Sequence, residues 1–277
     1  MDTALDLTVP VIIGGTIAAL LMGLSKTGLP PLGALGAAVI ATVLPPVPAA
    51  GVALPLLIVG DLVAVSTYGR NVRWRILRTL LPSVALGILV GFAALRWAPP
   101  DVSARIVGAL LLLAGLGDLV RQLAARRAAR RSPSGPAFNP VPDDDAAAAP
   151  EPAATRPRPR DRIARTALGA TAGLSTMIAN AGGPPMSLYL LRAGVSRAGL
   201  LGTVALFFLT VNLAKLPFSA SLGLVSPDSL RVSLVLLPGM VAGLLLGRLV
   251  AHRISGPVFS TTVLVATALA GARLLLG

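Results

Sequence analysis

The 277-residue sequence contains no cysteine, one histidine and only two lysines. Without cysteine, the chain forms no disulfide, thiolate metal site or thiol nucleophile. The single histidine, His252, stands beside Arg253 between apolar stretches, where neither a metal ligand nor a catalytic base is expected. No glycine-rich loop of the P-loop kind occurs, so ATP is not the direct energy source. We therefore expect no catalytic residue, metal or cofactor, and no enzyme.

Charged residues and aromatic residues are also scarce. Only 13% of the residues are charged and 4% are aromatic, whereas 55% are hydrophobic. A soluble domain carries about 25% charged residues. The net charge of +13 would suggest a nucleic-acid partner in a soluble protein, but here the arginines cluster between apolar segments and too few aromatics are present for base stacking. The composition predicts an all-α polytopic membrane protein whose surroundings are a lipid bilayer and which binds no nucleic acid.

The apolar residues fall into two groups of five segments. The first group lies at about Leu7–Leu24, Leu32–Leu44, Val52–Tyr68, Ile76–Trp97 and Val102–Leu119. The second group lies at about Ile163–Ala179, Pro184–Leu191, Gly199–Phe218, Leu230–Val250 and Val258–Leu276. The short segments either cross the membrane or dip into it and return, so eight to ten helices are expected.

Between the two groups the composition changes to arginine, proline, alanine and acidic residues, which cannot bury a core. We predict a first membrane repeat at 1–122, a disordered cytoplasmic linker at 123–162 and a second membrane repeat at 163–277.

The two halves of the chain match one another in sequence. A shift of 154 residues superposes Gly28 on Gly182, Pro30 on Pro184 and Asp61 on Lys215, and a shift of 156 superposes Pro82 on Pro238. Internal repeats of this length are typical of secondary transporters. Arginine-rich loops mark the cytoplasmic side, and tracing the segments from them places both termini outside. Each half then crosses an odd number of times, which predicts inverted repeats in a bacterial inner membrane.

Each half contains a break where glycine and proline interrupt an apolar segment, at Lys26–Pro31 and at Asn180–Pro185. Proline and glycine cannot continue an α-helix, and a bilayer tolerates such breaks only where the backbone lines a cavity or finds protein partners. The helix that restarts after each break presents free N–H groups and a positive dipole end, which suit an anion. We expect the breaks to meet near the midplane. The predicted substrate-binding residues are Ser25, Lys26, Thr27, Gly28, Asn180, Ala181, Gly182, Gly183, Asn212 and Lys215.

Both lysines and one carboxylate, Asp61, lie in apolar surroundings. A charge within a membrane segment is normally paired or functional, because insertion costs about 2.5–3.5 kcal/mol. Lys26 and Lys215 are predicted to supply positive charge, although snorkelling to an interface is the alternative. Asp61 is predicted to balance that charge through an ion pair with Lys215 or to accept a proton in a coupled cycle. A purely structural hydrogen bond is the third interpretation.

Two glycine pairs have the spacing of helix-packing motifs, Gly87 with Gly91 and Gly243 with Gly247. Glycines four residues apart let two helix backbones approach closely. We interpret both pairs as contacts inside the bundle, with homodimerisation as the alternative.

Several of these stretches resemble the TauE/SafE family of membrane permeases, also called the sulfite exporter family. The resemblance rests on Gly23–Gly28, Gly60–Tyr68, Pro82 with its following glycines, Ser175–Pro185 and Asn212–Pro217. It implies transport of small anions such as sulfite, thiosulfate or organosulfonates, whereas the residues alone indicate only a carrier with an anion-friendly site. The alternatives are a passive anion channel and a membrane-embedded enzyme that acts on an anionic lipid.

Overall fold

The computed structural model describes residues 5–27, 31–99, 159–180 and 197–250, together with part of 102–124 and a few residues near the C-terminus. The helices with complete bounds are α1 (Val9–Thr27), α2 (Pro31–Val43), α3 (Pro46–Tyr68), α4 (Trp74–Trp97), α6 (Pro159–Ala179), α8 (Arg197–Ser221) and α9 (Pro227–Val250). A short 3₁₀ turn, η1 (Gly69–Asn71), follows α3. The described residues between 102 and 124 are also helical, and the described part contains no strand.

Proline sets where several helices begin. Proline is the first residue of α2, α3, α6 and α9. Its fixed φ suits the first turn, where the missing N–H would have had no helical partner. At α9 the start is also capped, because Ser229 N donates to Ser226 Oγ while Ser226 N donates to Ser229 Oγ. This reciprocal arrangement satisfies backbone donors that the helix itself leaves open.

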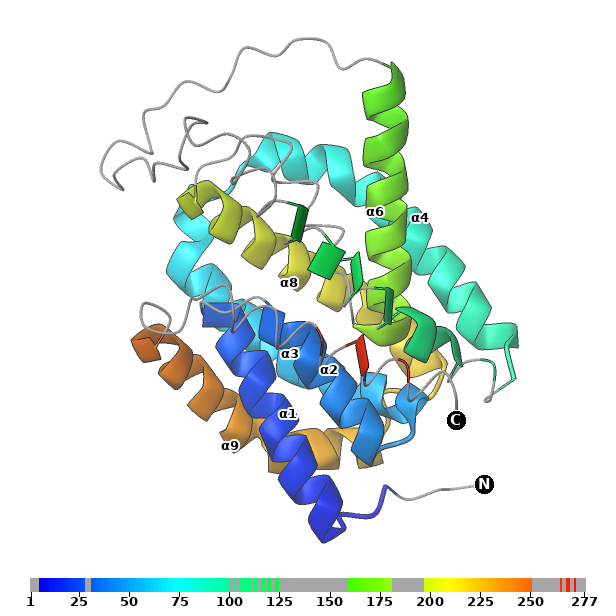
Figure 1. The fold of residues 1–277 in the computed structure, drawn as a ribbon, viewed down its shortest axis with the longest axis vertical. Helices are drawn as coiled ribbons and strands as arrows, with labels where there is room; N and C mark the ends of the chain where they lie inside the picture. Colours follow the sequence, from blue (N-terminus) through cyan, green and yellow to red (C-terminus); the bar gives the residue numbers. More distant parts are fainter. Residues whose placement is uncertain are drawn as a thin grey trace.

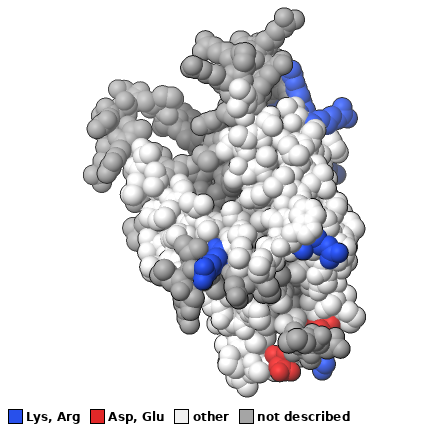
Figure 2. Space-filling model, turned by 90° about the vertical axis from the view of Figure 1, so that its right-hand side faces the viewer, with Lys and Arg blue, Asp and Glu red and all other residues white. Residues whose placement is uncertain are grey.

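Five described helices are long and apolar enough to cross a membrane, and they correspond to α1, α3, α4, α8 and α9. Many of their large apolar side chains face outward, among them Leu86, Leu89, Leu234 and Leu245. Figure 2 shows a face of the molecule on which most described atoms belong to uncharged residues. Outward apolar side chains with polar groups inside suit a lipid solvent. The described part of the chain is therefore all helical, and the protein is a multi-pass membrane protein.

The helices pack in pairs that join the two halves of the chain. α1 packs along α9, α4 packs along α6, and α3 lies against α8. In Figure 1 the α1–α9 pair occupies the lower left and the α4–α6 pair the right. One core cluster fills the space among α1, α2, α3 and α9, including Met22, Ile40 and Met240. A second cluster joins α4, α6 and α8 around Phe207 and Met177.

Glycine allows both of these helix pairs to approach closely. A side chain at Gly87 on α4 would meet the Ala170 carbonyl of α6, and one at Gly243 on α9 would meet the Leu20 carbonyl of α1. The next glycine of each pair, Gly91 or Gly247, also lies against the facing helix. The interpretation of both glycine pairs as contacts within the bundle is confirmed.

Two boundaries differ from the sequence prediction. α1 continues to Thr27, three residues beyond the predicted Leu24, since lysine favours helix and glycine and proline follow only from residue 28 onward. The Ser25 and Thr27 hydroxyls donate back to carbonyls of the same helix, which satisfies them in apolar surroundings. α6 begins at Pro159 and not at Ile163, since proline opens its first turn. Residues 125–158 of the predicted linker lie outside the described residues. The same holds for the predicted segment at 184–191 and for nearly all of the predicted segment at 258–276.

Candidate functional site

Four polar residues from three helices meet inside the protein: Lys26 near the end of α1, Asp61 on α3, Asn212 on α8 and Lys215 one turn further along α8. The Asp61 side chain is fully buried, and Asn212 and Lys215 are each 1% exposed. In a lipid-embedded bundle these groups have no water to solvate them, so their hydrogen-bond partners decide their energies.

Asp61 is held from two sides. Lys26 Nζ lies 2.5 Å from Asp61 Oδ1, and Asn212 Nδ2 donates to Asp61 Oδ2 at 2.6 Å. The predicted ion pair between Asp61 and Lys215 is wrong, since the salt bridge of Asp61 is formed with Lys26. The reason is the helix crossing: Gly60 lets the Lys26 side chain lie directly against α3 beside Asp61.

Lys26 makes one further contact. Its Nζ atom lies 4.7 Å from the centroid of the Phe208 ring, over the face of α8 that carries Asn212 one turn later. An aromatic face attracts a cation and retains this attraction when a carboxylate partner changes its charge. The Lys26 side chain is 13% exposed, so it is the least enclosed member of the group.

Lys215 has partners of another kind. Its Nζ donates to Asn180 Oδ1 at 2.6 Å, to the Thr176 carbonyl at 2.8 Å and to Thr176 Oγ1 at 3.4 Å. All three acceptors are neutral and belong to the last turn of α6 or the residue after it. Among the residues that the structure describes, Lys215 forms no salt bridge. Its amino group is therefore surrounded by neutral dipoles, and no described carboxylate contacts it directly.

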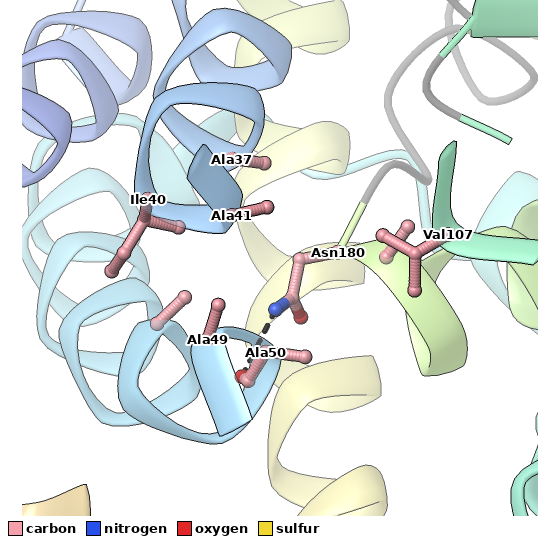
Figure 3. A pocket seen from close by; sticks show the side chains of 9 residues that line it. Ala37, Ile40, Ala41, Ala49, Ala50, Val107 and Asn180 are labelled. Carbon is pink, nitrogen blue, oxygen red and sulfur yellow. Dashed lines mark hydrogen bonds between the residues drawn. The ribbon is translucent and has the colours of Figure 1, made fainter. Parts of the chain in front are cut away.

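Asn180 links this lysine to α3. Its Nδ2 donates to the Ala50 carbonyl at 3.1 Å (Figure 3). Its Oδ1 accepts from Lys215. The residue follows the end of α6 and has φ of 52°, a left-handed conformation that asparagine tolerates better than most residues. Local backbone geometry and the side-chain bonds thus hold the amide in one place.

A small cavity of about 10 Å³ lies beside Asn180. Its wall is mostly alanine from α2 and α3, including Ala37, Ala41, Ala49 and Ala53. A space of this size holds about one water molecule. A larger solute in this cavity would have to displace the amide or widen the space between these helices.

One polar atom in the network has no partner. Asn212 Oδ1 is buried and forms no hydrogen bond to any described group. An unsatisfied buried acceptor costs about 1–3 kcal/mol, so its presence needs an explanation.

The structure brings together five of the predicted residues: Lys26, Asp61, Asn180, Asn212 and Lys215. Ser25 and Thr27 instead use their hydroxyls within α1. Gly28, Ala181, Gly182 and Gly183 lie outside the described residues. The prediction missed two residues of the network, Thr176 and Phe208. Each lies one helical turn before a predicted polar residue, so the i, i+4 spacing from Asn180 and Asn212 is the signal that could have found them.

Comparison with known proteins places this arrangement in a family. Searches against curated proteins and against solved structures gave no match. The sequence matches the TauE/SafE sulfite exporter family over residues 7–274, which is nearly the whole chain. This family consists of membrane permeases, and the match agrees with the resemblance seen in the sequence motifs. The chain belongs to the TauE/SafE sulfite exporter family.

Proposed function

We propose that this protein is a secondary carrier of small anions, sulfite or related sulfur-containing anions, and that the anion binds beside Lys215 and Asn180. The observation that carries the proposal is the position of the Lys215 amino group, which is buried among neutral acceptors with no carboxylate partner in the described part of the chain. A buried charge without a counter-charge is costly, and an anionic substrate would supply that counter-charge.

The electrostatic balance of the network supports the same conclusion. In their ordinary ionised forms Lys26 and Asp61 neutralise one another, and Lys215 adds one uncompensated positive charge. Asn180 and Thr176 hold the ammonium in place but carry no negative charge. An oxyanion that replaces the Asn180 amide at the ammonium would gain a charge-assisted hydrogen bond.

Burial favours a carrier over a passive channel. An open pore would leave its polar lining in contact with water, whereas Asp61 and Lys215 are buried and the cavity beside Asn180 has room for about one water. A carrier alternates between states open to either side and passes through an occluded one. The described conformation fits such an occluded state.

The packing of the helices supports two inverted repeats. The sequence shifts relate α1 to α6, α3 to α8 and α4 to α9. Under these relations the pair α1–α9 corresponds to the pair α6–α4, and both pairs are observed. The contact between α3 and α8 joins two helices that are equivalent in the two halves, as expected for a pair on the axis that relates the repeats. We propose that the two repeats are inserted in opposite senses in a bacterial inner membrane, with the linker that precedes α6 in the cytoplasm and both termini outside.

Flux in proteoliposomes tests this function. Purified protein would be reconstituted and offered radiolabelled sulfite, thiosulfate, sulfate and methanesulfonate. We expect saturable uptake of at least one anion and faster uptake when the same unlabelled anion is inside, because a carrier exchanges and a channel does not. Non-saturable flux without exchange would identify a channel, and no movement of any of these anions by folded protein would contradict the proposed substrate class.

A further inference from the structure

The described network contains a second feature that anion binding alone does not explain: the buried, unpartnered Oδ1 atom of Asn212. An ionised carboxylate only accepts hydrogen bonds, so the amide must turn its Nδ2 group toward Asp61. That orientation leaves Oδ1 without a donor. The unpartnered state of Asn212 Oδ1 therefore depends on the charge of Asp61.

We propose that Asp61 and Asn212 form a proton site, and that protonation of Asp61 turns the Asn212 amide and releases Lys26, so that both become donors for the transported anion. The proposal rests on the anion-carrier function above and specifies how that carrier is coupled. The proton binds at Asp61 Oδ2, and no covalent bond other than the new O–H bond forms.

The geometry of the three groups gives the reason. A protonated Asp61 can donate from Oδ2, which lies 2.6 Å from the Asn212 amide. Rotation of that amide by half a turn places Oδ1 against the new O–H group and satisfies the acceptor that is unpartnered in the present state. The same rotation moves the NH₂ group to the place that Oδ1 now occupies. An acceptor is thereby replaced by two donors, which an anion needs.

Lys26 changes at the same time. Neutral Asp61 no longer holds the ammonium through a salt bridge, but the Phe208 ring still lies 4.7 Å from Nζ. The ammonium therefore remains near α8, close to Asn212 and to the turn that carries Lys215. The local charge rises by one when Asp61 takes up a proton, which adds to the attraction that Lys215 exerts on an anion. We therefore expect the proton and the anion to move together.

The other charged groups around Asp61 lie on the elements that pack against α3. Lys26 on α1 and Lys215 on α8 are the charged residues whose fields reach Asp61, and α2 carries no charged residue. On the remaining elements that pack on α3, charged residues stand near the helix ends. They are Arg70 on η1, Arg197 on α8, Asp228, Arg231 and Arg248 on α9, and Arg160, Asp161, Arg162 and Arg165 on α6. Arg248 bonds to Thr67 near the end of α3.

Infrared difference spectroscopy tests the proton site without requiring transport. Spectra of the purified full-length protein would be recorded from neutral to mildly acidic pH for the wild type, Asp61→Asn and Asn212→Leu. Asp228→Asn serves as the matched control, because it makes the same chemical change on an exposed carboxylate. Circular dichroism would confirm that each variant is folded.

We expect a protonated-carboxyl band in the wild type and in Asp228→Asn that is missing from Asp61→Asn and shifted in Asn212→Leu. The shift reports the hydrogen bond between the carboxyl and the amide. Absence of a band that depends on Asp61 across this range would overturn the proposal. So would a band whose frequency is the same with and without the Asn212 amide.

Proton movement tests the coupling itself. Proteoliposomes containing a pH-sensitive dye would be given the anion that showed saturable flux, with thiosulfate and methanesulfonate preferred because they carry no titratable proton near neutral pH. We expect protons to move with the anion in the wild type and not in Asp61→Asn. Anion flux without proton movement in the wild type would overturn the coupling. If no anion moves but the carboxyl band is present, the proposed function fails while the proton site stands.

Discussion

Lys26 and Asn180 are 154 residues apart and stand at the corresponding ends of α1 and α6, where each bonds to the residue 35 positions further along the chain. Lys26 bonds to Asp61, and Asn180 bonds to Lys215. The two pairs thus occupy equivalent places in the two halves but differ in charge. The first pair is neutral as a whole and the second carries one positive charge. We infer that the second pair offers the anion its binding charge.

This difference leads to a prediction for Asn180→Asp. A carboxylate at this position would lie next to Lys215 Nζ, which is now 2.6 Å from Asn180 Oδ1, and would neutralise the charge that the anion needs. We expect the thermal unfolding midpoint to hold or rise, because the buried lysine gains a partner. Anion uptake should fall by at least about tenfold, which corresponds to about 1.4 kcal/mol of lost binding.

Asn180→Gly is the matched comparison. Glycine adopts the left-handed conformation at φ of 52° without strain but removes the amide. We expect it to retain more anion uptake than Asn180→Asp, since it leaves the charge of Lys215 uncompensated. Uptake by Asn180→Asp that equals the wild-type rate would argue against an anion site at this position.

A second prediction concerns the buried pair of Lys26 and Asp61. Lys26→Met leaves a buried carboxylate without its cation, and loss of one partner from a buried pair costs about 3–5 kcal/mol. The double variant Lys26→Met with Asp61→Leu removes both charges and should recover much of that loss. Thermal unfolding in detergent would measure both. A double variant that is less stable than Lys26→Met alone would show that the ion pair is not the source of the effect.

A third prediction concerns the contact between α4 and α6. Gly87→Ala places a methyl group against the Ala170 carbonyl, so one helix has to move. Overpacking of this kind costs about 1–3 kcal/mol. The control is Gly117→Ala, because nothing lies near the position of its added carbon. The unfolding midpoint should drop for Gly87→Ala only, and equal midpoints for the two variants would contradict the close packing described here.

The sequence was sufficient to predict the features that depend on neighbouring residues along the chain. Long apolar runs predicted the spanning helices, and α4 ends at Trp97 as expected because Pro99 and Pro100 follow. Lys26, Asp61 and Lys215 were recognisable because charges are rare inside apolar segments. The glycine pairs predicted close helix contacts for a similar reason, since only small residues permit them.

The partners of these groups depended on how the helices cross, which no local pattern contains. Sequence spacing alone is compatible with an ion pair between Asp61 and either lysine. The close packing of α1 against α3 at Gly60 places Lys26 beside Asp61, so the salt bridge forms with Lys26. Thr176 and Phe208 were missed because threonine and phenylalanine are ordinary residues of apolar helices. Their roles appear only when α6 and α8 bring them against Lys215 and Lys26.

The measurement that tests the central claim most directly is exchange uptake of the transported anion by Lys215→Met and Lys215→Arg beside the wild type. Methionine is an unbranched, uncharged side chain only one atom shorter than lysine, whereas arginine keeps the charge. Our account predicts saturable uptake in the wild type, loss of uptake in folded Lys215→Met, and partial uptake in Lys215→Arg. Saturable uptake by Lys215→Met at the wild-type rate and half-saturating concentration would contradict it.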